Sequence, residues 1–264
     1  MSKETLAVIS DIHGNRWALE AVLEDIASRG IDRIVNLGDS AYGPLDPFAT
    51  VKILMERGIP SVRGNEDRIL GDRRFGSATV RFVRERLLPE QIEWLVTRPA
   101  SLLHDGNFFM CHGTPAGDTE YLLRVVEGGA TRMRTARGVL SKLKGVHAPV
   151  ILCGHDHQPA TLPLPGGRLA VNPGSVGLQA YTDDDPREHI VETGLPLARY
   201  CILSKEGGGN EGTGGSAPRG AGWRVEHAGV DYDHEAASFH ALRNGRPDWA
   251  WWLISGKALN GGKA

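Results

Sequence analysis

The chain has 264 residues, 41 % of them hydrophobic, and a formal net charge of −2 from 30 basic and 32 acidic side chains. This near-neutral balance argues against a nucleic-acid-binding or membrane-binding surface, because both need an excess of basic residues. A chain of this length commonly forms one α/β domain that buries about 70–75 % of its unfolded surface. We therefore predict a single domain over residues 1–264.

Cysteine use predicts where the protein resides. Cys111, Cys153 and Cys201 each lie in an apolar, strand-like run, where a free thiol behaves as a small buried hydrophobe. Three such cysteines favour a reducing compartment, and the cytoplasm is the default. Residues 1–4 lead directly into the first predicted strand, and no apolar run approaches the roughly 18 residues of a membrane span. We expect neither a signal peptide nor a membrane segment.

Polar residues follow each of the first three predicted strands. The apolar run 6–9, typical of a strand covered on both faces, is followed by Asp11 and His13. The strand predicted over 33–39 ends at Asp39, and the strand over 59–63 runs into Asn65. Helices predicted over 19–26 and 47–57 imply parallel pairing, which brings strand ends to one edge of the sheet. By itself the Asp-x-His pair is weak, and a helix-capping aspartate beside a surface histidine is the alternative.

The middle of the chain alternates helical excursions with strands. Residues 68–98 and 118–144 are predicted to be mostly helical, with Tyr121, Leu122 and Leu123 packing near the strand ends. Further strands are predicted over 107–111, 150–153 and 168–171. They lead into His112-Gly113, into Gly154-His155-Asp156-His157, and into the turn Asn172-Pro173-Gly174-Ser175-Val176-Gly177.

The C-terminal part reads as a hairpin followed by helices. Residues 198–203 and 223–227 are its predicted arms, and the glycine-rich segment 206–222 is predicted to be a flexible tip. That tip contains a G-x-G-x-x-G match without the helix that must follow it, so we assign it no phosphate-binding role. A C-terminal helical segment is predicted over 234–259. Its tryptophans 249, 251 and 252 should pack in the core, with a homo-oligomer interface as the alternative.

The predicted strand ends together offer seven oxygen and nitrogen ligands: Asp11, His13, Asp39, Asn65, His112, His155 and His157. This mixture without thiolates suits Mn, Fe, Zn or Co, of which we favour Mn or Fe. Seven ligands exceed the needs of one catalytic ion, so two ions sharing a bridging carboxylate are the economical solution. Such a pair, about 3.5–4 Å apart, clamps the attacking and leaving oxygens of an in-line displacement. We predict hydrolysis of a phosphate ester by attack of a metal-bridging hydroxide.

The ordered motifs Asp-x-His, Gly-Asp, Gly-Asn, His-Gly and Gly-His-x-His over residues 6–177 resemble those of the calcineurin-like metallophosphoesterase superfamily. Asn-Pro-Gly-Ser-Val at 172–176 resembles its compact bacterial and archaeal branch. The resemblance implies a four-layer α/β/β/α sandwich, with two mixed β-sheets flanked by helices. It also implies one ion held by Asp11, His13, Asp39 and His157, and a second held by Asp39, Asn65, His112 and His155.

Two departures from the family pattern bear on catalysis. Gly38-Asp39 continues as Ser40-Ala41, where the family's protein phosphatases and dinucleotide tetraphosphatases have Asp-Arg-Gly, so an arginine that helps bind phosphate is absent. Many relatives have Gly-Asn-His, whose histidine protonates the leaving group, but here Glu66 follows Asn65. Either Glu66 is the acid, with a raised pKa, or it is an ordinary solvated carboxylate. Without an acid, activated esters should react faster than alkyl monoesters, because general acid catalysis contributes about 10²–10⁴-fold.

We predict four catalytic residues: Asp39, Asn65, Glu66 and His112, of which Asn65 and His112 also contact substrate. Asp156 and Asn172 are candidates to orient the imidazoles, although a turn residue explains Asp156 equally well. The expected function is hydrolysis of a small phosphomonoester or phosphodiester. The alternatives are a protein serine/threonine or dinucleotide tetraphosphate phosphatase and, from another class, a non-catalytic metal-binding scaffold.

Overall fold

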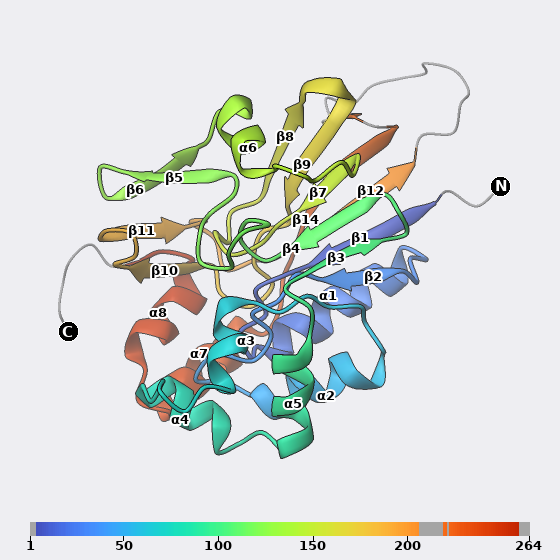
Figure 1. Cartoon of the computed structure of the whole chain (residues 1–264). Helices are drawn as coiled ribbons and strands as arrows, with labels where there is room; N and C mark the ends of the chain where they lie inside the picture. The colour runs from blue at the N-terminus through green and yellow to red at the C-terminus, as the bar shows by residue number, and fades with distance from the viewer. Residues whose placement is uncertain (1–3, 206–218, 221, 259–264) are drawn as a thin grey trace.

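Two five-stranded mixed sheets form the centre of the structure (Figure 1), a computed structural model that describes residues 4–205, 219–220 and 222–258. The first sheet has the strand order β13-β14-β12-β1-β2 and the second β3-β4-β7-β9-β8. The first comprises β1 (Thr5–Ile9), β2 (Ile34–Asn36), β12 (Ala198–Lys205), β13 (Arg219–Gly220) and β14 (Trp223–Val230). The second comprises β3 (Ser101–His104), β4 (Phe108–Cys111), β7 (Val150–Leu152), β8 (Ala160–Leu164) and β9 (Arg168–Asn172).

Eight α-helices lie around the two sheets in the described part of the chain. They are α1 (Arg16–Ser28), α2 (Pro47–Glu56), α3 (Asn65–Leu70), α4 (Ala78–Arg84), α5 (Pro89–Thr97), α6 (Ala136–Lys142), α7 (His234–Arg243) and α8 (Pro247–Ser255), with a 3-10 turn at Pro165–Gly167. Figure 1 shows α6 on the side of the sheets opposite to α1, α7 and α8. None of the helices in the described ranges is long and apolar enough to cross a membrane.

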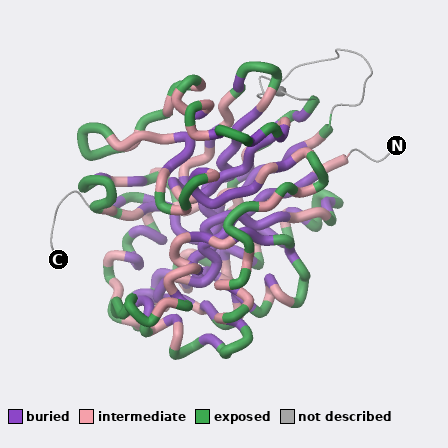
Figure 2. The backbone as a smooth tube through the Cα atoms, viewed as in Figure 1, coloured by how far each residue is buried: buried purple, intermediate pink, exposed green. Residues whose placement is uncertain are grey.

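Two core clusters flank the first sheet, because β1 alternates its side chains between the second sheet and the helices. Leu6 and Val8 pack toward Phe108 and Met110 of the second sheet, whereas Ala7 and Ile9 pack toward the buried face of α1. The central strands are accordingly buried and the outer loops exposed (Figure 2). The four-layer sandwich of two mixed sheets is therefore confirmed.

Parallel pairing brings the ends of four strands to one edge. β1 pairs with β2 in parallel, and β4 pairs with β7 in parallel in the other sheet. The prediction of a strand over 59–63 was wrong except at Ser61. This residue alone pairs with the sheet, as a parallel bridge to Asn36. Pro60 lacks the backbone N–H that a longer ladder would need.

The prediction of a mostly helical segment over 118–144 was also wrong. Its centre is a hairpin of β5 (Arg124–Glu127) and β6 (Ala130–Met133), and only α6 is helical. Gly128 and Gly129 connect the strands with φ of 61° and 79°, a two-residue turn that suits the twist of a hairpin. The hairpin lies beside a second one, β10 (Ala180–Asp183) and β11 (His189–Glu192), where Ile190 N donates to Gly129 O at 3.0 Å.

The predictions for the C-terminal part of the chain are confirmed in part. The hairpin at 198–203 and 223–227 is confirmed as the longer pair β12 and β14, and the C-terminal helices are α7 and α8. Most of the predicted tip, 206–218 and residue 221, lies outside the described residues, as does residue 259. The single-domain assignment stays a prediction.

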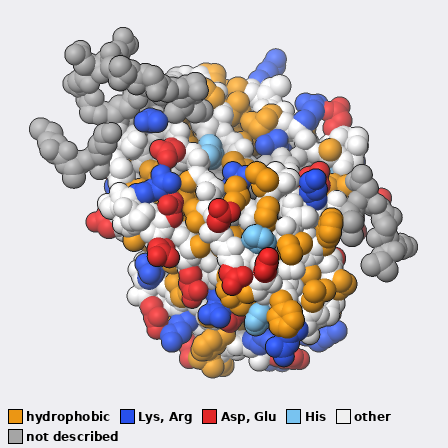
Figure 3. Space-filling model, turned by 180° about the vertical axis from the view of Figure 1, so that it is seen from behind, with side chains coloured by type: hydrophobic (Ala, Val, Ile, Leu, Met, Phe, Trp, Pro, Cys, Tyr) orange, Lys and Arg blue, Asp and Glu red, His pale blue; other side chains and the backbone are white. Residues whose placement is uncertain are grey.

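Trp249 and Trp252 are buried, whereas Trp251 is 43 % exposed. Basic and acidic side chains are interspersed over the face seen in Figure 3.

Candidate metal centre

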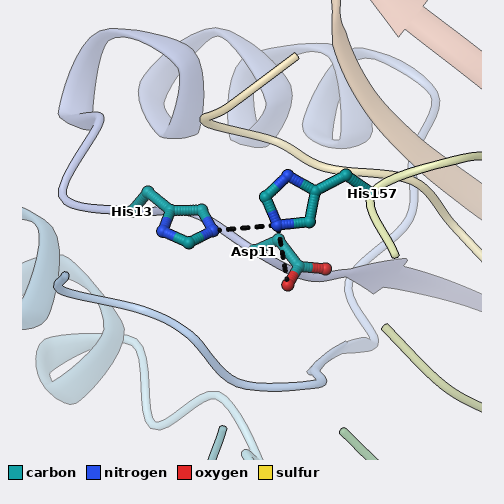
Figure 4. Close-up of side chains that lie close together, drawn as sticks. All are labelled: Asp11, His13 and His157. Carbon is teal, nitrogen blue, oxygen red and sulfur yellow. Dashed lines mark hydrogen bonds and ion pairs between the residues drawn. The ribbon is translucent and has the colours of Figure 1, made fainter. Parts of the chain in front are cut away.

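Carboxylate and imidazole groups converge where β1 and β7 end. Asp11 and His13 follow β1, and His157 lies in the loop after β7. Figure 4 shows the three side chains pointing toward one another. His13 Nε2 lies 3.1 Å from His157 Nε2, and His157 Nε2 lies 3.4 Å from Asp11 Oδ1. These three residues form a group able to hold one metal ion.

A second group lies beside the first. Asp39 follows β2, His112 follows β4, and His155 lies in the loop after β7. His112 Nε2 is 3.0 Å from Asp39 Oδ2 and 3.9 Å from Asp11 Oδ1, so the two groups adjoin. The structure thus brings together all the predicted histidine and aspartate ligands, from strands of both sheets.

Backbone carbonyls orient three of the imidazoles. The Nδ1 atoms of His13, His112 and His157 lie 2.8–2.9 Å from the carbonyl oxygens of Tyr42, Leu37 and Leu178, respectively. A carbonyl oxygen can only accept, so each Nδ1 carries the proton. The Nε2 lone pairs are therefore directed into the cluster, as metal-binding imidazoles require.

Strained backbone is concentrated at the centre. Asp11, His13, Asp39, His155 and His157 all have positive φ, between 51° and 71°, and Asp105 is the one other described non-glycine residue that does. Each such residue costs about 1–3 kcal/mol, and strain of this kind clusters at functional sites. The left-handed conformation turns these side chains toward a common point that regular strand geometry would not reach.

Glycines and a serine hold the loops close together. A Cβ atom on Gly64 would lie 1.9 Å from Asp39 Oδ1, and one on Gly154 would lie 2.1 Å from Ser10 Oγ. Side chains at either position would therefore displace the ligand loops. From the turn after β9, the Ser175 hydroxyl donates to the Asp11 carbonyl at 2.8 Å, a brace that our sequence interpretation did not identify.

The protonation of the histidines shows how well the group fits a cation. Burial alone would lower the pKa values of His13 and His112, but nearby carboxylates raise both. Glu66 is the main carboxylate that raises the pKa of His13 to about 9. Asp39 is the main carboxylate that raises the pKa of His112 to about 10. Burial, aided by His112, lowers the pKa of His155 to about 4. Burial alone would raise the pKa of Asp11, but His157, His112 and His13 together hold it below its usual range. The Nε2 atoms and carboxylates of the cluster face one another, so a positive charge between them is favourable. Protons on the imidazoles supply it in the absence of metal, and a metal ion can replace those protons.

Asn65, Glu66 and Asp67 lie side by side at the start of α3. Asn65 Oδ1 is buried with no hydrogen-bond partner among the described residues, as expected of an oxygen kept for a metal ion. Glu66 Oε2 is 3.2 Å from His13 Nδ1, and burial raises the Glu66 pKa to about 7. Asp67, which we had not singled out, accepts from the backbone N–H groups of Ser40 and Gly64 and so joins two ligand loops.

The two residues predicted to orient imidazoles make other contacts. Asn172 donates to the Gly154 carbonyl at 2.9 Å and accepts from Gly174 N at 2.8 Å. Asp156 accepts from Gln158 N at 3.0 Å. These bonds shape the ligand-bearing turns, whereas backbone carbonyls orient three of the four imidazoles.

A cavity of about 230 Å³ lies over the centre. Predicted site residues line one side: His13, Asp39, Asn65, Glu66, His155 and His157. The other side includes Tyr181 of β10 and, from the C-terminal segment, Arg246, Trp249 and Trp252. No local motif marked these four residues, because the fold alone brings them to the centre.

A four-layer sandwich with paired aspartate and histidine clusters at the carboxyl edge of its strands defines the metallo-dependent phosphatase class of fold. Residues 5–192 match the family model of the calcineurin-like phosphoesterase superfamily domain. The chain belongs to this superfamily.

Relatives extend the similarity along most of the chain. An uncharacterised protein of Methanocaldococcus jannaschii is 26 % identical over 275 aligned residues, which cover 94 % of this chain and 96 % of the relative. A crystal structure of a metallophosphoesterase from Sphaerobacter thermophilus has a TM-score of 0.71 at 24 % identity, covering 97 % of this chain and all of that one. A hypothetical protein of Pyrococcus horikoshii OT3 has a TM-score of 0.69 at 17 % identity, covering 97 % and 99 %. These structures support the fold.

Proposed function

We propose that the chain is a dinuclear metal-dependent phosphoesterase that hydrolyses a small phosphomonoester or phosphodiester. The observation that carries the proposal is the pair of adjoining ligand groups with inward-facing Nε2 atoms. One ion would be held by Asp11, His13, Asp39 and His157, and the other by Asp39, Asn65, His112 and His155. Bound ions of this kind lower the pKa of water and neutralise charge on a phosphoryl group.

The chain's own residues supply position and proton transfer. Asp39 is fixed by the backbone N–H of Glu66, which donates to its Oδ1 at 2.9 Å, and so stays directed at His112. Asn65 lines the cavity in which a phosphoryl group would lie, and His112 lies behind it against Asp39. A cavity of about 230 Å³ is below the roughly 300–1,000 Å³ of drug-sized pockets, which favours a small substrate. Three buried, unpaired cysteines favour a cytoplasmic location.

Metal analysis and a hydrolysis screen test this function together. We expect two transition-metal ions per chain, and turnover of bis-p-nitrophenyl phosphate with added Mn. The screen should include phosphomonoesters, cyclic nucleotides, a dinucleotide tetraphosphate and a phosphopeptide, because activity confined to the last two would favour the alternative phosphatases. A protein that binds no metal and hydrolyses none of them would contradict the proposal.

Glu66 is the proposed leaving-group acid, since its carboxyl group lines the cavity beside the ligands. Glu66→Gln should lower kcat for glycerol phosphate by about 10²-fold or more, because an alkoxide needs a proton to leave. The loss with p-nitrophenyl phosphate should be far smaller, because p-nitrophenolate leaves unprotonated. Steady-state kinetics with both esters measures the difference. Equal losses on the two substrates would show that Glu66 acts otherwise.

Metal binding should release protons, because His13 and His112 have pKa values of about 9 and 10 without an ion. Below pH 9 each imidazole must lose a proton to bind metal, so apparent Mn affinity should rise up to about tenfold per proton released for each pH unit. Activity should fall correspondingly as the pH is lowered. Calorimetry in buffers of different ionisation enthalpy counts the protons. Affinity and activity that stay flat down to pH 5 would contradict this assignment.

A further inference from the structure

Arg246 is the only lysine or arginine among the described residues that line the cavity over the centre. It immediately precedes α8 and its side chain is 29 % exposed. Its position lies outside residues 5–192, which match the superfamily. The cationic group of this cavity is thus contributed by the C-terminal segment.

Neighbouring side chains hold the guanidinium in a fixed orientation. Arg246 Nε and Nη2 donate to the Asp248 carboxylate at 2.9 and 2.6 Å, and Nη1 donates to Thr79 Oγ1 at 2.6 Å. These bonds use three of the five N–H groups of an arginine. Two N–H groups are left without acceptors among the described residues. A planar group held in this way is preorganised to bind an oxyanion.

Trp249 neighbours both the guanidinium and the metal ligand His13. The indole lies 5.9 Å from the His13 ring, between centroids, and 5.5 Å from Arg246 Cζ. Among the described residues, Arg246 donates its hydrogen bonds to Asp248 and Thr79 and to none of the ligand atoms. A group bound there would belong to a part of the substrate distant from the scissile phosphorus.

We propose that Arg246 binds a second oxyanion of the substrate, a phosphate or carboxylate separated from the scissile phosphate by a short chain. The inference rests on the proposed function, and it narrows the substrate to a phosphate ester with two anionic ends. Three acidic side chains line the cavity, Asp39, Glu66 and Asp183, and Arg246 is the one lysine or arginine among its described lining residues that can complement that second charge.

Two non-hydrolysable phosphonates test the inference by titration calorimetry on the Mn-loaded protein. 4-Phosphonobutyrate and pentylphosphonate have chains of similar length, and only the first carries a carboxylate. The wild type should bind 4-phosphonobutyrate at least about tenfold more tightly, since hydrogen bonds to charged groups are the strong ones. Arg246→Gln should remove this preference while leaving pentylphosphonate affinity unchanged, and Arg246→Lys should retain part of it.

Arg243→Gln is the matched control, because Arg243 lies near the end of α7 and does not line the cavity. It should keep the full preference, and thermal melts of each variant verify folding. Any of three results would overturn the inference. The wild type could bind the two phosphonates equally well, Arg246→Gln could keep the preference for 4-phosphonobutyrate, or Arg243→Gln could lose it. Hydrolysis of bis-p-nitrophenyl phosphate tests the function separately: activity without the preference contradicts only the role of Arg246, and the preference without activity contradicts only the function.

Discussion

Asp11→Asn should lower phosphoesterase activity by more than about 100-fold while leaving the fold intact. The Asp11 carboxylate is fully buried and lies within 3.9 Å of the Nε2 atoms of both His157 and His112. It therefore lies between His157 of the first ligand group and His112 of the second. Loss of a residue that merely orients a ligand costs about 10–100-fold, so loss of a ligand should exceed that range. Hydrolysis of bis-p-nitrophenyl phosphate and metal content per chain are the measurements.

The fold should survive because backbone hydrogen bonds hold Asp11 in place, and asparagine keeps a side-chain oxygen that can accept from the His155 N–H as the carboxylate does. Asp11 N donates to the Gly38 carbonyl, and its own carbonyl accepts from Ser175 Oγ. Asparagine also tolerates the positive φ of 54° better than most residues. The melting temperature of metal-free Asp11→Asn should stay within a few degrees of the metal-free wild type. Asp32→Asn, at an exposed carboxylate, should be fully active. Retained activity and metal in Asp11→Asn would exclude Asp11 as a ligand.

The predicted ligands could be found because they follow buried strands. Runs such as 6–9 and 150–153 are apolar without interruption, so their polar ends stand out and parallel pairing dictates where they meet. The β5–β6 hairpin was missed although Gly128-Gly129 is a turn signal, since the apolar residues nearby were interpreted as helical. Short strands such as β3 and β10 carry little apolar patterning.

The far wall of the cavity could not be predicted in the same way. Tyr181, Arg246 and Trp249 belong to no local motif, and their roles depend on contacts between distant segments. Asn244 Nδ2, for example, donates to the Pro44 carbonyl 200 residues away and helps to dock α7 beside the loop that carries Tyr42. Spacing rules describe neighbours in sequence and cannot anticipate such docking. The metal ligands could therefore be predicted from the strand ends, whereas the residues on the opposite side of the cavity could be identified only from the three-dimensional structure.

Removing metal should abolish activity and also lower thermal stability. The close approach of His13 Nε2 to His157 Nε2 and of His112 to Asp39 requires a cation or protons between these groups, so bound ions stabilise the folded state selectively. At a free ion concentration of about 100 Kd, each ion adds about 2.7 kcal/mol to the free energy of unfolding. For a chain of this size that is roughly a 5–10 °C rise in melting temperature per ion. Chelation followed by thermal melts and assays measures both effects.

The identity of the restoring ion makes this test specific. Four imidazoles favour Mn, Fe, Co or Zn over Ca, which prefers oxygen ligands alone. Mn should therefore restore both activity and melting temperature to chelated protein, and Ca should restore neither. In Asp11→Asn the rise on adding Mn should be clearly smaller, because one ligand group has lost its carboxylate while the other remains. Equal stabilisation of the wild type and Asp11→Asn by Mn would mean that the ion binds elsewhere. Because this readout is a melting temperature, it locates the metal without a substrate assay.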